Sequence, residues 1–473
     1  WRRAYWKGRV SESLGRANEA IASYRVAEDV LATMARSLRL DGGREGLLMK
    51  RQPSSARLVD LLLERERYDE ALCVARTARS RADQLLARTE RLAALSPRRR
   101  ERWRAAGVEI ERLQRALAAS QESRHLLPID ERADHDRAQD ATATELSTAR
   151  SVALGVLYGA RSDREEAPCD ALRTPSPSEL ALLLFPLDPP QQRWGVFAFD
   201  AKGTRAARIE FTADDPTALI DLLQGRFAST LETAESLRVL ATASTWSTPF
   251  ASLPWRGSPL LEHVPISLSL DLATPLSEAP THRNALVVGD PNGDLEQARL
   301  EAVAIATALH AEGWQVTTLQ GQAATVDRLR TAVGEVSLLH FAGHAREAGI
   351  HGWESRVQLG AGGRLDARDI LGLDATPQVA ILPACEVVAT SQGSLGGGMS
   401  VARSLLLSGT EVVVGGTHKL DDGIARSVSE ALYAAGVPTT AEEATRSLHG
   451  ALLKVAAETG DPAVLDSFVA LVP

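Results

Sequence analysis

The sequence predicts an α/β domain with a mostly parallel central sheet flanked by helices, preceded by an all-α region. Two observations support this fold class. Before about residue 125, small and apolar residues recur at helical spacing. After Ser178, short apolar runs alternate with helical patterns, which is typical of a parallel sheet covered by helices on both faces.

Three segments are expected along the 473 residues. Residues 1–125 are predicted to form helical repeats and long helices, and residues 178–473 the α/β domain. Between them, residues 126–177 are predicted to be a helical connector that ends in a linker. The linker prediction depends on three prolines in "REEAPCDALRTPSPSE".

The composition is that of a soluble globular protein, with 44% hydrophobic and 24% charged residues. No apolar run approaches the ~18 residues that a membrane span needs, so we expect no membrane contact. The three cysteines are an odd count, so at least one thiol is free, and they favour a reducing compartment. The start has neither an initiator Met nor an apolar signal core. We therefore expect a piece of a longer cytoplasmic protein.

The charge is distributed unevenly along the chain. Residues 1–125 carry 27 Lys and Arg against 17 Asp and Glu, whereas the remainder is acidic. A basic segment is compatible with nucleic-acid binding. However, these arginines alternate with acids at helical spacing, and no aromatic residues lie among them. We expect solvated helix faces that dock an acidic domain or partner, without nucleic acid.

Small residues in the first segment recur as they do in stacked helical hairpins, where they let two helices approach closely. The two sets lie about 51 residues apart and are Ala20, Tyr24 and Ala27, with Gly8 upstream, and then Ala71, Ala75 and Ala78. The pattern resembles tetratricopeptide repeats, although the spacing exceeds the usual ~34 residues. A generic helical bundle remains the alternative.

Three predicted strands end in residues that carry chemistry. "VSLLHFAGHA" ends at His344, "QVAILPAC" at Cys385, and "EVVVGGTHK" near Thr417 and His418. If these strands are parallel neighbours, the residues meet at one edge of the sheet. A thiol beside an imidazole then supplies a nucleophile and a general base. The backbone N–H groups of Cys385 and Ala345 are candidates for an oxyanion site.

His340 and His344 lie four residues apart and raise the question of a metal site. On a strand their separation is roughly 13 Å, which is too far to chelate one ion. A zinc-binding helix would also need Glu where Phe341 follows His340. We therefore expect His340 to be a hydrogen-bonded core histidine and His344 the working one, with no metal and no cofactor.

The segment from about Pro175 to Pro473 resembles a CHAT domain, a caspase-like peptidase module that often follows tetratricopeptide repeats. The resemblance lies in "LLHFAGHA", in "VAILPACEV", and in the Gly-rich "SQGSLGGGMSVARSLLLSGTEVVVGGTHKLDDGIA". It implies a caspase-like fold related to caspases and separases, with His344 and Cys385 as the catalytic pair.

Two positions depart from the family pattern. Ala345 stands where the family usually has Gly, and His418 occupies a loop in which the family commonly has Trp. In relatives, that loop helps to form the specificity pocket.

Substrate contacts are expected from five residues around these loops, namely Glu386, Thr417, His418, Asp421 and Asp422. The Asp421 and Asp422 pair has two interpretations. It would bind a basic substrate side chain, or it would cap the helix that follows. The side chain of Glu386 would either tune the thiol or face solvent.

The resemblance implies a cysteine endopeptidase that cleaves a protein partner in the cytoplasm, in bacterial defence or regulated cell death. The tetratricopeptide-like region would recruit the substrate or an activating protein. Two alternatives stay open: a non-proteolytic scaffold, favoured by Ala345 and His418, and a metal-dependent hydrolase.

Overall fold

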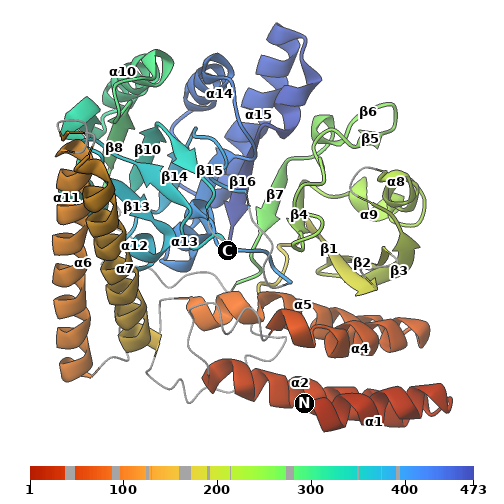
Figure 1. The fold of residues 1–473 in the computed structure, drawn as a ribbon. Coiled ribbons are helices and arrows are strands. Elements are labelled where there is room, and N and C mark those ends of the chain that lie inside the picture. The colour runs from red at the N-terminus through yellow and green to blue at the C-terminus, as the bar shows by residue number, and fades with distance from the viewer. Residues whose placement is uncertain are drawn as a thin grey trace.

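The computed structural model describes residues 1–37, 48–87, 96–123, 127–128, 130–158, 172–188, 192–212, 215–272, 282–348, 351–373, 375–389 and 395–473. An N-terminal helical region lies beside an α/β region that is built on one large sheet (Figure 1). This arrangement confirms the predicted fold class. Residues 164–171 of the predicted linker lie outside the described residues.

The helical region begins with two hairpins. Its helices are α1 (Arg2–Ser13), α2 (Ala17–Ser37), α4 (Pro53–Glu64), α5 (Tyr68–Leu86), α6 (Pro97–Ser123) and α7 (Arg132–Tyr158). Ala20, Ala71 and Ala75 are fully buried. A Cβ added at Gly8 would lie 2.6 Å from the ring of Tyr24, so this glycine lets α1 and α2 approach closely. The expected helical hairpins are confirmed, whereas the tetratricopeptide assignment stays a prediction.

The central sheet has 11 strands in the order β3-β2-β1-β4-β7-β16-β15-β14-β10-β8-β9. They are β1 (Glu179–Asp188), β2 (Arg193–Asp200), β3 (Gly203–Glu210), β4 (Ser236–Leu240), β7 (Ile266–Ser269), β8 (Asn284–Gly289), β9 (Gln315–Gln320), β10 (Leu338–Ala342), β14 (Val379–Leu382), β15 (Val412–Gly416) and β16 (Phe468–Val472). Neighbouring strands are parallel except at β1–β2, β2–β3 and β15–β16. The sheet is therefore mostly parallel, as expected.

Helices cover both faces of the sheet. In Figure 1, α10 (Glu296–Ala311), α14 (Asp422–Ala434) and α15 (Ala441–Thr459) lie above it, and α12 (Ala367–Leu371) and α13 (Val401–Leu407) below it. The shorter elements are α8 (Thr217–Gln224), α9 (Ala228–Leu231), α11 (Val326–Val333), η4 (Leu260–Glu262), η5 (Gly321–Ala323), η6 (Pro462–Asp466), the pair β5 (Pro254–Trp255) and β6 (Ser258–Pro259), and the small sheet β11 (Ala345–Arg346), β12 (Arg356–Gln358) and β13 (Arg364–Asp366).

Four parallel strands of this sheet position the candidate site. In β8, β10 and β14, Val287, His340 and Ile381 stand opposite one another. β15 lies on the far side of β14 and also runs parallel to it. The carboxyl ends of β8, β10, β14 and β15 therefore lie along one edge, and the loops that follow them are neighbours.

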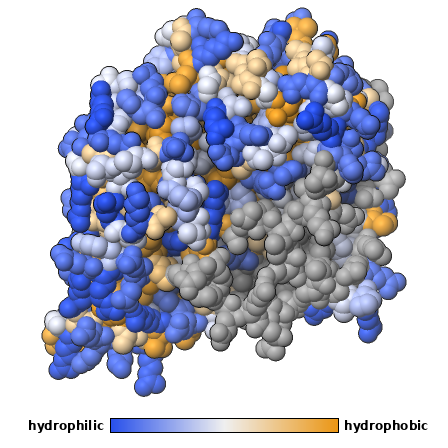
Figure 2. All heavy atoms as spheres, turned by 180° about the vertical axis from the view of Figure 1, so that it is seen from behind, coloured by the Kyte–Doolittle hydropathy of each residue, from blue (hydrophilic) through white to orange (hydrophobic). Residues whose placement is uncertain are grey.

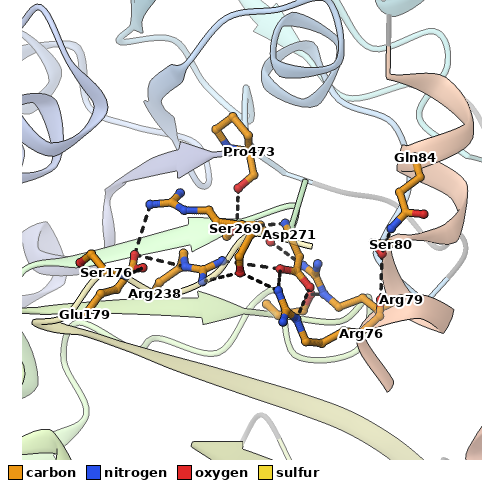
Figure 3. A network of polar contacts seen from close by, with 12 residues as sticks. Arg76, Arg79, Ser80, Gln84, Ser176, Glu179, Arg238, Ser269, Asp271 and Pro473 are labelled. Carbon is orange, nitrogen blue, oxygen red and sulfur yellow. Dashed lines mark hydrogen bonds and ion pairs between the residues drawn. The ribbon is translucent and has the colours of Figure 1, made fainter. Parts of the chain in front are cut away.

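The helical region shares a hydrophobic core with the sheet and is joined to it by buried arginines. Leu58 and Leu62 of α4 pack in one cluster with Leu183 of β1 and Phe197 of β2. Figure 3 shows the polar side of this junction, where arginines of α5 reach the carboxyl end of β7. The predicted boundary at residue 178 thus separates segments that are packed together.

Two arginines of α5 carry most of this polar junction. Arg76 donates two hydrogen bonds to the carboxylate of Asp271, at 2.6 and 2.8 Å. Arg79 is fully buried and donates to the backbone carbonyls of Ala241 and Ser269. For these two residues the expectation of solvated helix faces is wrong, because they dock into the sheet. The expected docking onto an acidic group is present at Asp271.

Hydrophilic residues cover most of the coloured surface on the face seen in Figure 2, with hydrophobic residues scattered between them. None of the helices in the described part of the chain combines the length and the hydropathy that crossing a bilayer requires.

Candidate active site

Cys385 lies three residues beyond the end of β14, in a tight turn. It is half-buried and is a free cysteine, and the amide of Leu420 lies 3.5 Å from its Sγ. No backbone hydrogen bond is recorded for its own amide within the described residues. The thiol and the amide are thus both available to a ligand. Cys73, by contrast, is disulfide-bonded.

Glu386 connects the loops around the nucleophile. Its φ of 57° is left-handed, a conformation that costs a non-glycine residue free energy. Its amide donates to the carbonyl of His418, at 3.3 Å, and its Oε2 accepts from the amide of Glu347, at 3.5 Å. Glu386 therefore joins the loops that follow β10, β14 and β15. The sequence analysis expected the Glu386 side chain to tune the thiol or to face solvent, and it did not predict this contact with Glu347.

His344 follows β10 and is 37% exposed as a side chain. Its Nε2 lies 3.1 and 3.2 Å from the two carboxylate oxygens of Asp294, in the loop between β8 and α10. Within the described residues no hydrogen bond joins His344 to Cys385. Catalytic hydrogen bonds are often long or absent before substrate binds, so the absence of this bond does not exclude His344 as a candidate base. The carboxylate occupies Nε2, and Nδ1 is the ring nitrogen left for the thiol.

The loop that carries Asp294 is held in place by Asp290, which is buried. The Asp290 Oδ1 accepts from the amides of Gly293 and Leu295, both at 2.9 Å, and its Oδ2 accepts from the Arg299 guanidinium. Sequence reasoning did not find Asp294. The only available signal was its place after a predicted strand, in "GDPNGDLEQ".

Two glycines allow these loops to approach one another. A Cβ at Gly343 would lie 2.8 Å from Pro291 Cδ, and a Cβ at Gly416 would lie 2.6 Å from the carbonyl oxygen of Ala384. Both distances are shorter than real Cβ contacts show. Glycine is therefore required beside His344 and opposite the residue that precedes Cys385.

Ala345 begins β11 and stands opposite Val357 of β12. The amide of Gln358 donates to the carbonyl of His344, at 2.9 Å, which makes Ala345 and Val357 a non-hydrogen-bonded pair of the antiparallel ladder. The N–H of Ala345 therefore points away from the ladder. The change from Gly to Ala leaves this donor in place.

His340 is fully buried, as expected of a core histidine. Its Nε2 lies 3.2 Å from Glu301 Oε1 on α10, and its Nδ1 lies 3.4 Å from the hydroxyl of Tyr433 on α14. Burial raises the pKa of Tyr433 well above its ordinary value, and Glu301 adds to the shift. His340 thus connects β10 to the two helices, α10 and α14, that pack on one face of the sheet. The described residues contain no cluster of three or more His, Cys, Asp or Glu side chains that could hold a metal ion.

The loop after β15 contains the remaining predicted residues. Thr417 donates its hydroxyl to the carbonyl of Asp466, at 2.6 Å, and lies 2.8 Å from His418 Nδ1. Asp421 caps α14 by accepting from the amides of Gly423 and Ile424. Capping, one of its two interpretations, is therefore its role in this structure.

Asp422 lies close to the candidate base. Burial and the neighbouring Asp421 raise the pKa of Asp422, whereas His344 lowers it. His344 therefore faces carboxylates from two loops, Asp294 after β8 and Asp422 after β15.

The fold and this edge define an α/β protein in which a half-buried cysteine and a histidine follow adjacent parallel strands. The chain belongs to the CHAT domain family, whose match spans residues 217–464, slightly more than half of the sequence. The match begins after β3 and includes every residue of the candidate site. No curated protein matches the chain.

Among solved structures, the chain is similar to separase in two crystal structures of the Saccharomyces cerevisiae separase–securin complex, at 3.0 and 2.6 Å resolution. Sequence identity is 13% in both, and the TM-scores are 0.36 and 0.34. The similarity covers 51% of this chain but only 15% and 16% of those chains.

Proposed function

We propose that the protein is a caspase-like cysteine endopeptidase that cleaves a protein partner through Cys385 and His344. The observation that carries this proposal is the placement of the two residues after β10 and β14, which are adjacent and parallel, at the same edge of the sheet. Membership of the CHAT family supports the same class of enzyme.

The reaction begins when His344 takes the proton of the Cys385 thiol through Nδ1. The sulfur then bonds to the carbonyl carbon of the scissile peptide, and the carbonyl oxygen becomes an oxyanion. The amides of Cys385 and Ala345 would donate to this oxyanion.

Collapse of the tetrahedral intermediate breaks the carbon–nitrogen bond. The leaving amine takes the proton from His344, and a thioester remains on Cys385. Water then attacks the thioester carbon and gives a proton to His344. The carboxylic acid departs, and the thiol is restored.

Asp294 would act on this reaction through His344. A carboxylate at Nε2 accepts the Nε2–H and so fixes the tautomer whose Nδ1 lone pair faces the thiol. It also stabilises the imidazolium that forms after proton transfer. We assign Asp294 as a positioning residue rather than a catalytic one, because it acts through His344.

The helical region would recruit the protein substrate or an activating protein. The buried contacts between α5 and the sheet support a direct connection between partner binding and the peptidase domain. By resemblance to the family, we place this activity in the cytoplasm, in bacterial defence or regulated cell death.

Hydrolysis of a mixed peptide library by the full chain tests the proposal. Mass spectrometry would identify new termini, and Cys385→Ala is the control. We expect products with the unsubstituted protein and none with the variant. Identical products, or none from either protein, would contradict the proposal and favour a non-proteolytic scaffold.

A further inference from the structure

A cavity of about 320 Å³ lies beside the nucleophile loop and has no role in the chemistry described above. It is enclosed by residues 243–251 after β4, by β7 and β16, and by α15. Its walls are largely apolar. The bulkiest of these side chains are Trp246, Phe250, Leu268, Leu448, Leu452 and Phe468.

The cavity adjoins the segment that carries Cys385. Ala389, four residues after the cysteine, forms part of the wall, and the Trp246 indole donates to the carbonyl of Val388, at 3.0 Å. His418 lines the cavity and is exposed, so the cavity reaches the surface at the loop after β15. The same loop places the Leu420 amide 3.5 Å from the Cys385 sulfur. The opening therefore lies next to the nucleophile.

The order of strands determines which part of a substrate would face this cavity. β15, β16 and β7 lie on one side of β14, and β10, which carries His344, lies on the other. The leaving amine must be near His344 to receive its proton. The acyl half of the substrate then lies on the cavity side of Cys385.

We infer that this cavity binds the side chain of the residue whose carbonyl Cys385 attacks, and that it selects a bulky apolar or aromatic residue. The inference rests on the proposed function. It deepens that function by naming the class of peptide bond that is cleaved.

The polar groups of the cavity fit an apolar occupant better than a cation. Among the described residues of its wall, the only carboxylate belongs to Asp466, whose Oδ1 already accepts from the amide of Ala251, at 3.0 Å. Burial raises the pKa of Asp466, because it disfavours the charged carboxylate. An arginine or lysine side chain would thus gain little compensation for the loss of its hydration.

Two buried polar atoms in the wall, Thr248 Oγ1 and His449 Nε2, have no hydrogen-bond partner within the described residues. Burial lowers the pKa of His449, so its imidazole is neutral at neutral pH. Both atoms can pair with a neutral hydroxyl. Tyrosine is therefore accepted along with leucine and phenylalanine, whereas acidic residues meet no lysine or arginine among the described residues of the wall.

Peptidyl fluoromethyl ketones that differ only in the residue next to the ketone test this inference on the full chain. The residues compared are Leu, Phe, Tyr, Asp and Arg, and mass spectrometry gives the rate of Cys385 labelling. We expect the Leu, Phe and Tyr probes to label at least ten times faster than the Asp and Arg probes. A faster Arg or Asp probe would overturn the inference and leave the peptidase assignment standing. If no probe labels Cys385 faster than a cysteine peptide, the proposed function itself fails.

Variants of the wall link the preference to the cavity. Leu452→Ala enlarges it and is expected to raise the ratio of Phe to Leu labelling at least threefold. Leu453→Ala, the neighbouring residue on α15 outside the lining, is the matched control and should leave the ratio unchanged. Ala243→Leu, at a half-buried lining position, narrows the cavity and should lower the ratio. Unchanged ratios in both lining variants would place the selected side chain elsewhere.

Discussion

Charged and nucleophilic side chains differ in burial and pairing between the two halves of the 11-stranded sheet. In the half that contains β1, β4 and β7, such groups are buried and paired with one another. In the half that contains β10, β14 and β15, His340 is also buried against Glu301, but Cys385 and His344 are only half-buried and lie beyond the strand ends. The first arrangement holds segments together, and the second leaves groups available to a ligand.

The paired half is illustrated by Arg238, which is fully buried in β4. It lies 3.2 Å from Glu179 and 3.6 Å from Asp271, and Asp271 also binds Arg76 of α5 (Figure 3). Burial lowers the pKa of Arg238 to about 10. It therefore remains charged at neutral pH and is stabilised by carboxylates on either side. In the other half, no ion pair to Cys385 is present among the described residues.

A second buried pair extends from the helical region toward the active-site half. Arg403 of α13 donates to both carboxylate oxygens of Asp83 on α5, at 2.7 and 2.8 Å, and to the carbonyls of Gly396 and Gly398. The loop that leads into α13 is thus fixed by a helix of the N-terminal region. This contact connects the two halves.

Removal of the nucleophile is expected to have the largest effect on activity. Cys385→Ala should lower peptide hydrolysis at least ~1,000-fold, because no other group supplies the attacking atom. The melting temperature should change little, since the thiol is half-buried and its contact with the Leu420 amide is long, at 3.5 Å. A large loss of thermal stability would instead place Cys385 in the structural half of the comparison. The measurements are hydrolysis rate and thermal unfolding.

Loss of the base is expected to have the next largest effect. His344→Ala should lower kcat by about 100- to 10,000-fold, the usual range for removal of a positioned general base. His340→Gln is the matched control, because His340 lies in β10, just before His344, but is buried against Glu301 and Tyr433. His340→Gln should lower the free energy of unfolding and leave kcat nearly unchanged. A large loss of kcat with little loss of stability would indicate that His340, and not His344, is the base.

The buried pair between α5 and α13 should matter to stability. Asp83→Asn leaves Arg403 without its charged partner, which typically costs about 3–5 kcal/mol in the free energy of unfolding. Urea unfolding measures this change. The exposed Glu442–Arg446 pair on α15 provides the control, since Glu442→Gln should have no measurable effect. Equal changes in the free energy of unfolding for Asp83→Asn and Glu442→Gln would show that burial does not determine how much these ion pairs contribute.

A smaller effect is expected at Asp294. Asp294→Asn should lower kcat about tenfold and leave KM unchanged, because the carboxylate acts on His344 and not on substrate. Asp327→Asn, an acid in the first turn of α11, is the control. Nitrogen NMR of His344 adds a readout that a structural role would not affect. It should report protonated Nε2 in the unsubstituted protein and a mixture of tautomers in the variant.

The smallest expected effect is a pH dependence of stability at His449. Because burial lowers the pKa of His449 in the folded state, the unfolded chain binds its proton at a higher pH than the folded chain does. The folded state is thus favoured above the unfolded pKa of about 6.5, and this contribution is lost as pH falls. Urea unfolding between pH 7.5 and 5.5 should decline more steeply in the unsubstituted protein than in His449→Gln. Equal slopes would contradict this assignment.

Much of the active-site half could be predicted from the sequence, because its signals are local. The near-continuous apolar runs around Leu338 and Val379 indicate buried parallel strands, and the residues that follow such strands lie at one edge. The sequence analysis did not predict β7, whose four residues ISLS alternate apolar and polar, or β16, which pairs antiparallel with β15 and so falls outside the parallel pattern. The strands of the small sheet, β11, β12 and β13, are shorter still, with two or three residues each.

The long-range pairs could not be predicted. Arg76, Arg79 and Arg403 look like the exposed arginines of any amphipathic helix, and their partners are distant in sequence, 195 residues away for Arg76 and 320 for Arg403. Asp294 was missed for a related reason. Its contact with His344 depends on the way in which Asp290 folds the loop, which no spacing in the sequence reveals.

The most direct test of the central claim, that His344 and Cys385 work as a pair, is site-resolved alkylation of the full chain with iodoacetamide at neutral pH. Mass spectrometry would compare Cys385 in the unsubstituted protein and in His344→Ala with the isolated peptide "VAILPACEV". We expect Cys385 to react at least ten times faster than the peptide, and to lose this advantage in the variant. A Cys385 that reacts no faster than the peptide, or equally fast with and without His344, would contradict the account.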